Sequence, residues 1–237
     1  MLEIDRNIFA MTQTQQMSKN QSTEAARFNM IEQQIRTWEV LDPVVLDLLG
    51  DVHREDFVDA SQLGLAFADV ELPIGFGQTM LFPKIEGRIL QALNIKRTDK
   101  VLLVGTGSGY LTALITKLAK HVDSIEIIPE LSKQAEARLQ KQNIDNVTLY
   151  VADAFTGYTT DKTYDVIVFA GALQLHPGAA EAMLNIGGRM FAVVGELPIM
   201  QATLTQRVSE DSCRKETLFE TCLPPLVNAP QSAKFEF

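Results

Sequence analysis

Three glycines at alternate positions are the residues whose spacing most clearly indicates chemistry in this sequence. Gly105, Gly107 and Gly109 alternate with Thr106 and Ser108, directly after an apolar run. An apolar run that ends in glycine is typical of a buried parallel strand that turns into a helix. Such a turn directs backbone N–H groups and a helix N-terminus at a ligand, and glycine allows the ligand to approach closely. The motif therefore predicts a nucleotide-like cofactor.

The glycine spacing also narrows the choice of cofactor. A dinucleotide fingerprint requires a third glycine at the sixth position, where this chain has Tyr110. No Gly-Lys-Ser/Thr phosphate loop follows. Gly-x-Gly-x-Gly instead suits S-adenosylmethionine, whose amino-acid end needs close backbone approach but brings no pyrophosphate. For the glycines alone, a tight turn between packed elements is the alternative interpretation.

Two acidic residues follow the glycines at strand ends. Glu126 lies 17 positions beyond Gly109, at the end of a second apolar run. An acid at this position accepts hydrogen bonds from both ribose hydroxyls in nucleotide-binding folds. Asp153 and Ala154 follow a third run, where the Asp153 carboxylate is placed to accept from an adenine amino group. We therefore expect Glu126, Asp153 and Ala154 in the cofactor site.

Apolar runs recur along the rest of the chain, separated by stretches with helical spacing. Alternation of strand and helix in units of about 30 residues specifies a doubly wound α/β sheet. We expect the last two strands to run antiparallel to the others. The expected strands cover residues 101–104, 122–127, 146–151, 164–169, 190–194, 202–208 and 216–223.

The N-terminal third is expected to add helices that lie on this sheet. An Asp-Pro pair at residues 42–43 predicts a cap and the first turn of one helix. Glycines and prolines in residues 58–83 indicate turns instead of strands. An earlier amphipathic helix is predicted to turn four apolar side chains toward the main domain: Phe28, Ile31, Ile35 and Trp38.

Composition excludes several classes of protein. The net charge is -9, from 30 acidic and 21 basic residues, which argues against a nucleic-acid partner. No apolar run approaches 18 residues, so we expect a cytoplasmic protein without a membrane partner. Cys213 and Cys222 lack metal-ligand spacing, and the three histidines are scattered, so we expect no metal site.

Two loops, in the order in which they occur, resemble the protein-L-isoaspartate O-methyltransferase family. Residues 73–79 read Pro-Ile-Gly-Phe-Gly-Gln-Thr, and a predicted helix separates them from Val-Leu-Leu-Val-Gly-Thr-Gly-Ser-Gly-Tyr. The resemblance covers roughly residues 25–226. Further segments similar to those of the family lie at residues 124–126, 129–131, 146–147, 187–190 and 223–226.

The resemblance implies a seven-stranded, Rossmann-like sheet of the class I methyltransferase type. It also implies methyl transfer from S-adenosylmethionine to the carboxylate of isoaspartyl residues in damaged proteins. The implied cofactor site comprises Gly105, Thr106, Gly107, Ser108, Gly109, Glu126, Asp153 and Ala154. The implied substrate loop comprises Gly77, Gln78 and Met80, with Thr79 and Leu81 at the catalytic positions.

The domain organisation follows from these assignments. We expect a flexible arm over residues 1–21, and N-terminal helices with the substrate loop over residues 22–98. Residues 99–237 are expected to form the S-adenosylmethionine-binding methyltransferase domain. The oligomeric state stays open.

Two positions differ from the family pattern. Leu81 stands where the family has a serine whose hydroxyl lies beside the methyl-transfer site, and Leu103 stands where it usually has an acid. Two alternatives to isoaspartyl methylation therefore stay open. One is a methyltransferase for a different carboxylate or a small-molecule acceptor, and the other is a catalytically weakened cofactor-binding paralogue. A nicotinamide enzyme is disfavoured by Tyr110.

Overall fold

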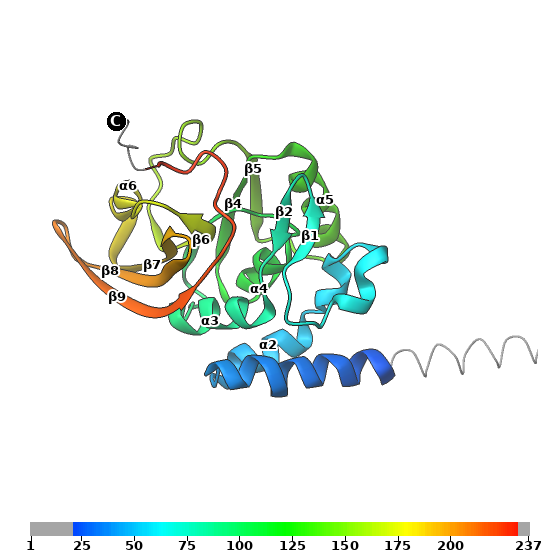
Figure 1. Cartoon of the computed structure of the whole chain (residues 1–237). Coiled ribbons are helices and arrows are strands. Elements are labelled where there is room, and N and C mark those ends of the chain that lie inside the picture. Colours follow the sequence, from blue (N-terminus) through cyan, green and yellow to red (C-terminus); the bar gives the residue numbers. More distant parts are fainter. Residues whose placement is uncertain (1–20, 232–237) are drawn as a thin grey trace, which may run out of the picture.

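A seven-stranded sheet forms the centre of the molecule in the computed structural model, which describes residues 21–231 (Figure 1). The strand order is β5-β4-β3-β6-β7-β8-β9. Strands β3 to β7 pair in parallel, and β8 is antiparallel to β7. β9 is antiparallel to β8 and so runs in the same direction as β3 to β7. The expectation that the last two strands run antiparallel to the others is therefore confirmed for β8 and wrong for β9. This is the mostly parallel α/β sheet that the alternation of apolar runs predicts. The strands are β3 (Lys100–Val104), β4 (His121–Glu126), β5 (Val147–Val151), β6 (Tyr164–Leu173), β7 (Leu184–Glu196), β8 (Ile199–Ser209) and β9 (Ser212–Thr221).

Strand β3 is buried on both faces, as its uninterrupted apolar sequence predicts. Val101 and Leu103 belong to a large hydrophobic core on one face, and Leu102 and Val104 to a smaller core on the other. The smaller core includes the short helix α6 (Gly178–Glu181). The larger core includes side chains of α2 (Pro43–Asp51), α3 (Pro83–Leu93), α4 (Tyr110–Leu118) and α5 (Pro129–Lys141).

An N-terminal helical layer lies along one side of the molecule, next to α2 (Figure 1). Residues 21–30 are α-helical and continue into the π-helical turn η1 (Ile31–Ile35) and the 3-10 turn η2 (Arg36–Trp38). The predicted cap of α2 is confirmed, because the Asp42 side chain accepts a hydrogen bond from the Val44 N–H. Apart from residue 21, the predicted flexible arm lies outside the described residues.

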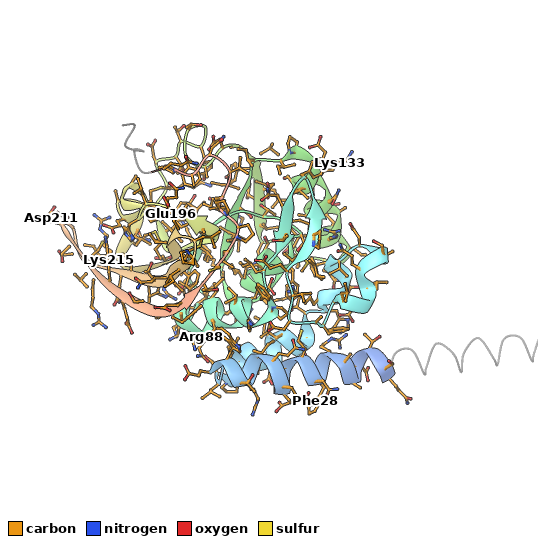
Figure 2. The ribbon with its side chains drawn as sticks, in the orientation of Figure 1. Phe28, Arg88, Lys133, Glu196, Asp211 and Lys215 are labelled. Atoms are coloured by element: carbon orange, nitrogen blue, oxygen red, sulfur yellow. The ribbon has the colours of Figure 1, made fainter. Side chains whose placement is uncertain are left out.

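The apolar face predicted for the first helix is partly wrong. Phe28 and Trp38 are 63% and 37% exposed, and Figure 2 shows Phe28 on the outer side of the helix. Ile35 is buried as predicted, but the buried side also carries Met30 and the charged Arg27, whose guanidinium pairs with Glu55. Apolar periodicity cannot identify an arginine that is buried because it forms an ion pair. The N-terminal layer also shares the larger core with the sheet, so the proposed boundary at residue 98 separates two parts of one core.

Residues 58–83 contain a hairpin that the sequence analysis missed. β1 (Leu72–Gly75) and β2 (Gln78–Met80) pair antiparallel, so the prediction of turns instead of strands is wrong here. The glycines mark the tip of the hairpin, because Gly75, Phe76 and Gly77 all have positive φ angles of 90°, 55° and 72°. The short 3-10 helices η3 (Arg54–Phe57) and η4 (Ala60–Leu65) precede it. No helix within residues 21–231 is long and apolar enough to cross a membrane.

A buried carboxylate ties together the strands at the edge of the sheet where β3 and β4 begin. Asp123 of β4 is 2% exposed. Its Oδ2 accepts hydrogen bonds from the Tyr164 hydroxyl at 2.8 Å and the Lys162 ammonium at 2.7 Å. Burial works to raise the pKa of Asp123, but these hydrogen bonds outweigh it and hold the pKa below its usual range.

We expect Asp123→Asn to lower the free energy of unfolding by about 2–3 kcal/mol at pH 7, because Lys162 and Tyr164 lose a charged acceptor. A carboxyl whose native pKa is depressed stabilises the fold above its unfolded pKa, and this contribution is lost as the pH falls through the native pKa. The difference between wild type and variant should therefore shrink as the pH is lowered from 7 to 3. Urea unfolding measures it, with the exposed Asp161→Asn as control. A difference that is constant with pH would contradict the assignment.

Candidate active site

The three glycines form the turn between β3 and α4, and their backbone conformation requires glycine. Gly105, Gly107 and Gly109 have φ angles of 96°, 54° and 88°, which side-chain-bearing residues rarely adopt. A Cβ atom at Gly105 would lie 3.3 Å from side-chain atoms of Ala170 and Leu226. The turn is fixed to the neighbouring strand, because the N–H groups of residues 105 and 106 both donate to the Ile125 carbonyl.

Glu126 lies beside this turn because β3 and β4 are adjacent parallel strands whose carboxyl ends share one edge of the sheet. Its side chain is 6% exposed. One carboxylate oxygen accepts the Gly107 N–H at 2.9 Å, and the other accepts the Ile128 N–H at 3.1 Å. Each oxygen has two lone pairs, so both retain acceptor capacity toward a ligand. The carboxylate is therefore held in a fixed position at the rim of the turn.

A cavity of about 760 Å³, including its open side, connects the glycine turn with the hairpin segment. Ten of the predicted site residues line it together: Gln78, Thr79, Met80, Leu81, Gly105, Thr106, Gly107, Ser108, Glu126 and Ala154. Gly77, Gly109 and Asp153 are not among the lining residues. Gly77 lies at the hairpin tip, and Gly109 packs against α5, where an added Cβ would lie 3.2 Å from that of Ala135.

Asp153 organises the loop next to the cavity. Its carboxylate accepts hydrogen bonds from the Phe155 N–H at 2.8 Å, the Thr156 hydroxyl at 2.8 Å and the Asn228 amide at 2.9 Å. The Phe155 N–H is the main reason that the pKa of Asp153 lies below its usual range. Because three protein donors occupy this carboxylate, its first role is to shape the loop and to hold the segment that contains Asn228.

The segment after β9 forms one wall of the cavity, which the sequence analysis missed. Leu226 and Val227 line the cavity. The Leu226 N–H donates to the Ala172 carbonyl, and the Ala172 N–H donates to the Pro224 carbonyl, so this segment runs parallel to the end of β6. Gly171 makes room for it, since a Cβ there would lie 2.9 Å from Leu226 Cγ. The paired prolines at 224–225 were the available sequence signal.

The two positions that differ from the family pattern have different surroundings. Leu81 is 6% exposed and lines the cavity, where Ile74, Met80 and Leu226 also contribute apolar surface. Leu103 is fully buried in the larger core and does not line the cavity. The change at 103 therefore fits the packing of the sheet, whereas the change at 81 alters the surface of the site.

Glu86 of α3 is a further cavity residue that the sequence did not indicate. It is 2% exposed and forms an ion pair with the equally buried Arg54. Burial raises the pKa of Glu86 to about 7, although the Arg54 guanidinium works in the opposite direction. Its partner lies 32 residues away in the sequence, so spacing alone could not reveal the pair.

This combination of fold and site defines a class of protein. A glycine-rich turn after β3, an acid at the end of β4 and a mostly parallel seven-stranded sheet in which β8 is reversed are the architecture of class I methyltransferases. The family model described as Protein-L-isoaspartate(D-aspartate) O-methyltransferase (PCMT) matches residues 25–231. The chain belongs to this family.

Individual relatives agree with this assignment. The chain is 39% identical over 200 residues to protein-L-isoaspartate O-methyltransferase of Protochlamydia amoebophila, and the match covers 84% of the chain and 95% of the relative. It is 35% identical over 207 residues to protein-L-isoaspartate O-methyltransferase 2 of Pelobacter propionicus, and this match covers 87% of the chain and 92% of the relative.

Solved structures share the fold at lower identity. A Plasmodium falciparum protein of the same description, solved in complex with S-adenosyl-L-homocysteine, superimposes with a TM-score of 0.70 at 17% identity. The match covers 86% of this chain and 97% of that protein. A second protein-L-isoaspartate O-methyltransferase structure gives a TM-score of 0.72 at 19% identity, and the match covers 84% of this chain and 65% of that protein.

Proposed function

We propose that this protein transfers a methyl group from S-adenosylmethionine to the side-chain carboxylate of isoaspartyl residues in proteins. The observation that carries the proposal is the continuous cavity, which joins the glycine turn and Glu126 to the Gln78–Leu81 segment. One end suits the cofactor and the other the acceptor. A cytoplasmic location, without nucleic-acid or membrane partners, is part of the same proposal.

The residues present fit the cofactor. Gly105 and Gly107 have positive φ angles and no side chains, so the backbone of the turn would allow close approach by the amino-acid moiety. The fixed Glu126 carboxylate has free acceptor capacity for two ribose hydroxyls. Ala154 and Phe155 line the cavity on the side where adenine would lie. We propose that Asp153 supports adenine through the loop that it orders.

Methyl transfer to a carboxylate requires little from the protein beyond alignment of the reacting atoms. When bound, S-adenosylmethionine supplies a methyl group on a positively charged sulfur. A carboxylate with a reference pKa near 4 is ionised at neutral pH, so one of its oxygens can take the methyl group through a lone pair while the methyl–sulfur bond breaks and its electron pair stays on sulfur. No general base is needed and no proton moves. The task of Thr79 and the Leu81 backbone is to hold the acceptor in line with the methyl group. This alignment supplies most of the rate enhancement. The buried Leu81 side chain excludes water from the reacting atoms.

An acceptor of a different kind is the second candidate. The specific observation in its favour is the apolar wall formed by Leu81, Met80 and Leu226, which offers an acceptor carboxylate no hydroxyl at position 81. A small molecule with an apolar body next to its carboxylate would suit this wall.

The test is a binding titration followed by a methyl-transfer assay. S-adenosylhomocysteine should bind by calorimetry, and an isoaspartyl peptide should be methylated while the same peptide with a normal aspartyl residue is not. Binding of the cofactor product with neither peptide methylated would reject isoaspartyl methylation and leave the second candidate and a catalytically weakened paralogue, which methylation of a small apolar carboxylate would distinguish. Absence of binding would remove the cofactor assignment as well.

A further inference from the structure

One buried arginine contacts both the acceptor segment and the residue that directly follows the glycine turn. Arg54, the first residue of η3, is 1% exposed. Its Nη1 pairs with the Glu86 carboxylate, and its Nη2 donates to the Leu81 carbonyl at 2.7 Å. Its guanidinium carbon lies 4.9 Å from the centre of the Tyr110 ring.

The three contacts belong to segments that must be aligned for methyl transfer. Leu81 follows β2 and lines the acceptor end of the cavity. Glu86 lies in the first turn of α3 and also lines the cavity. Tyr110 begins α4 directly after the glycine turn. A single guanidinium therefore connects the acceptor segment to the element that carries the cofactor turn.

Stability alone does not explain this arrangement. A buried ion pair is generally no more stabilising than well-packed apolar residues of similar volume, because both charges lose their hydration. Within the described residues, Arg54 Nε and the Tyr110 hydroxyl are buried without hydrogen-bond partners. Buried polar atoms without partners lower stability, so the cluster is not the most stable arrangement for this place. What the cluster does provide is a fixed position for the Leu81 main chain.

We propose that Arg54 is a positioning residue, which holds the Leu81 main chain at a fixed place relative to the glycine turn by bridging Leu81, Glu86 and Tyr110. The proposal deepens the methyltransferase function above and rests on it for its catalytic consequence. It assigns the side chain of Arg54 no contact with cofactor or acceptor.

The test separates positioning from stability with a double variant. Arg54→Met with Glu86→Leu removes both charges, so the melting temperature should stay near or above that of wild type. The Leu81 carbonyl nevertheless loses its donor. We expect amide hydrogen exchange at residues 80–82 to accelerate about tenfold, and kcat/KM for an isoaspartyl peptide to fall about tenfold. Affinity for S-adenosylhomocysteine should change by less than about threefold.

A matched control is available in the same layer. The pair Arg27–Glu55 is also partly buried and joins the first helix to η3, but it makes no contact with Leu81. Arg27→Met with Glu55→Leu should leave exchange at residues 80–82 and kcat/KM at wild-type values. If the Arg54 double variant does not fold, Arg54→Lys serves instead, because lysine keeps the charge beside Glu86 but cannot span both partners.

Each outcome decides the proposal. Wild-type exchange at residues 80–82 in a folded Arg54 variant would overturn it, and so would equal acceleration in the control pair. A wild-type protein without isoaspartyl activity would defeat the proposed function, while the exchange measurement would still support or reject the positioning role.

Discussion

Glu126→Ala is expected to weaken binding of S-adenosylhomocysteine by about a hundredfold. The carboxylate is proposed to accept two ribose hydroxyls, and charge-assisted hydrogen bonds contribute about 1.5–3 kcal/mol each. Loss of only one of them already exceeds a tenfold change in affinity. The substitution also removes the acceptor of the Gly107 N–H, which should loosen the glycine turn and add to the loss. Calorimetric titration measures the effect.

Two controls make this result specific. Glu130→Ala removes an exposed acid from the start of α5, close in the sequence, and should leave affinity unchanged. Glu126→Gln keeps one acceptor oxygen and should give an intermediate affinity. Circular dichroism should show that each variant is folded. Wild-type affinity in folded Glu126→Ala would remove this residue from the cofactor site and weaken the nucleotide interpretation of the glycine turn.

Leu81→Ser should raise turnover on an isoaspartyl peptide by about ten- to a hundredfold, if the protein is a family enzyme weakened by loss of the serine hydroxyl. One hydrogen bond to a charged acceptor is worth about 1–3 kcal/mol, which corresponds to one to two decades in rate. Affinity for S-adenosylhomocysteine should barely change. Initial rates at saturating cofactor give the comparison.

Thr79 provides the control for this experiment, because its side chain also lines the cavity. If the Thr79 hydroxyl already orients the acceptor, the wild type should be strongly active and Thr79→Val should abolish that activity. If the site accepts a different substrate, Leu81→Ser places a hydroxyl on an apolar wall, and isoaspartyl turnover stays near background. That last outcome would contradict the assignment of isoaspartyl residues as the acceptor.

Local patterns were sufficient to predict the sheet and the cofactor side of the site. Apolar runs identify buried strands directly, and β3 lies within one residue of the stretch 101–104. The ends of parallel strands meet at one edge, so Glu126 could be placed beside the glycines from the order of the runs alone. Six residues predicted from these patterns consequently line one cavity: Gly105, Thr106, Gly107, Ser108, Glu126 and Ala154. The segment 78–81, which lines the same cavity, was predicted only from the resemblance to the family.

Contacts between distant segments could not be predicted in this way. The hairpin β1–β2 was missed because its strands are short and surround three residues with positive φ. Arg54 and Glu86 are charged residues that single-sequence rules place in solvent, and only the fold brings them together. Phe28 was assigned to the core because periodicity does not reveal that Arg27 has a buried partner.

The wall formed by Leu226 and Val227 has a consequence for the order in which the site is completed during synthesis. The glycine turn, Glu126 and the hairpin are all translated in the first 126 residues. Leu226 is translated only after all nine strands, yet it lies where Gly105 and Gly171 leave room for it. A nascent chain can therefore assemble most of the sheet while its cofactor cavity still lacks one side. Cofactor affinity would then mark a chain that has been translated beyond Leu226.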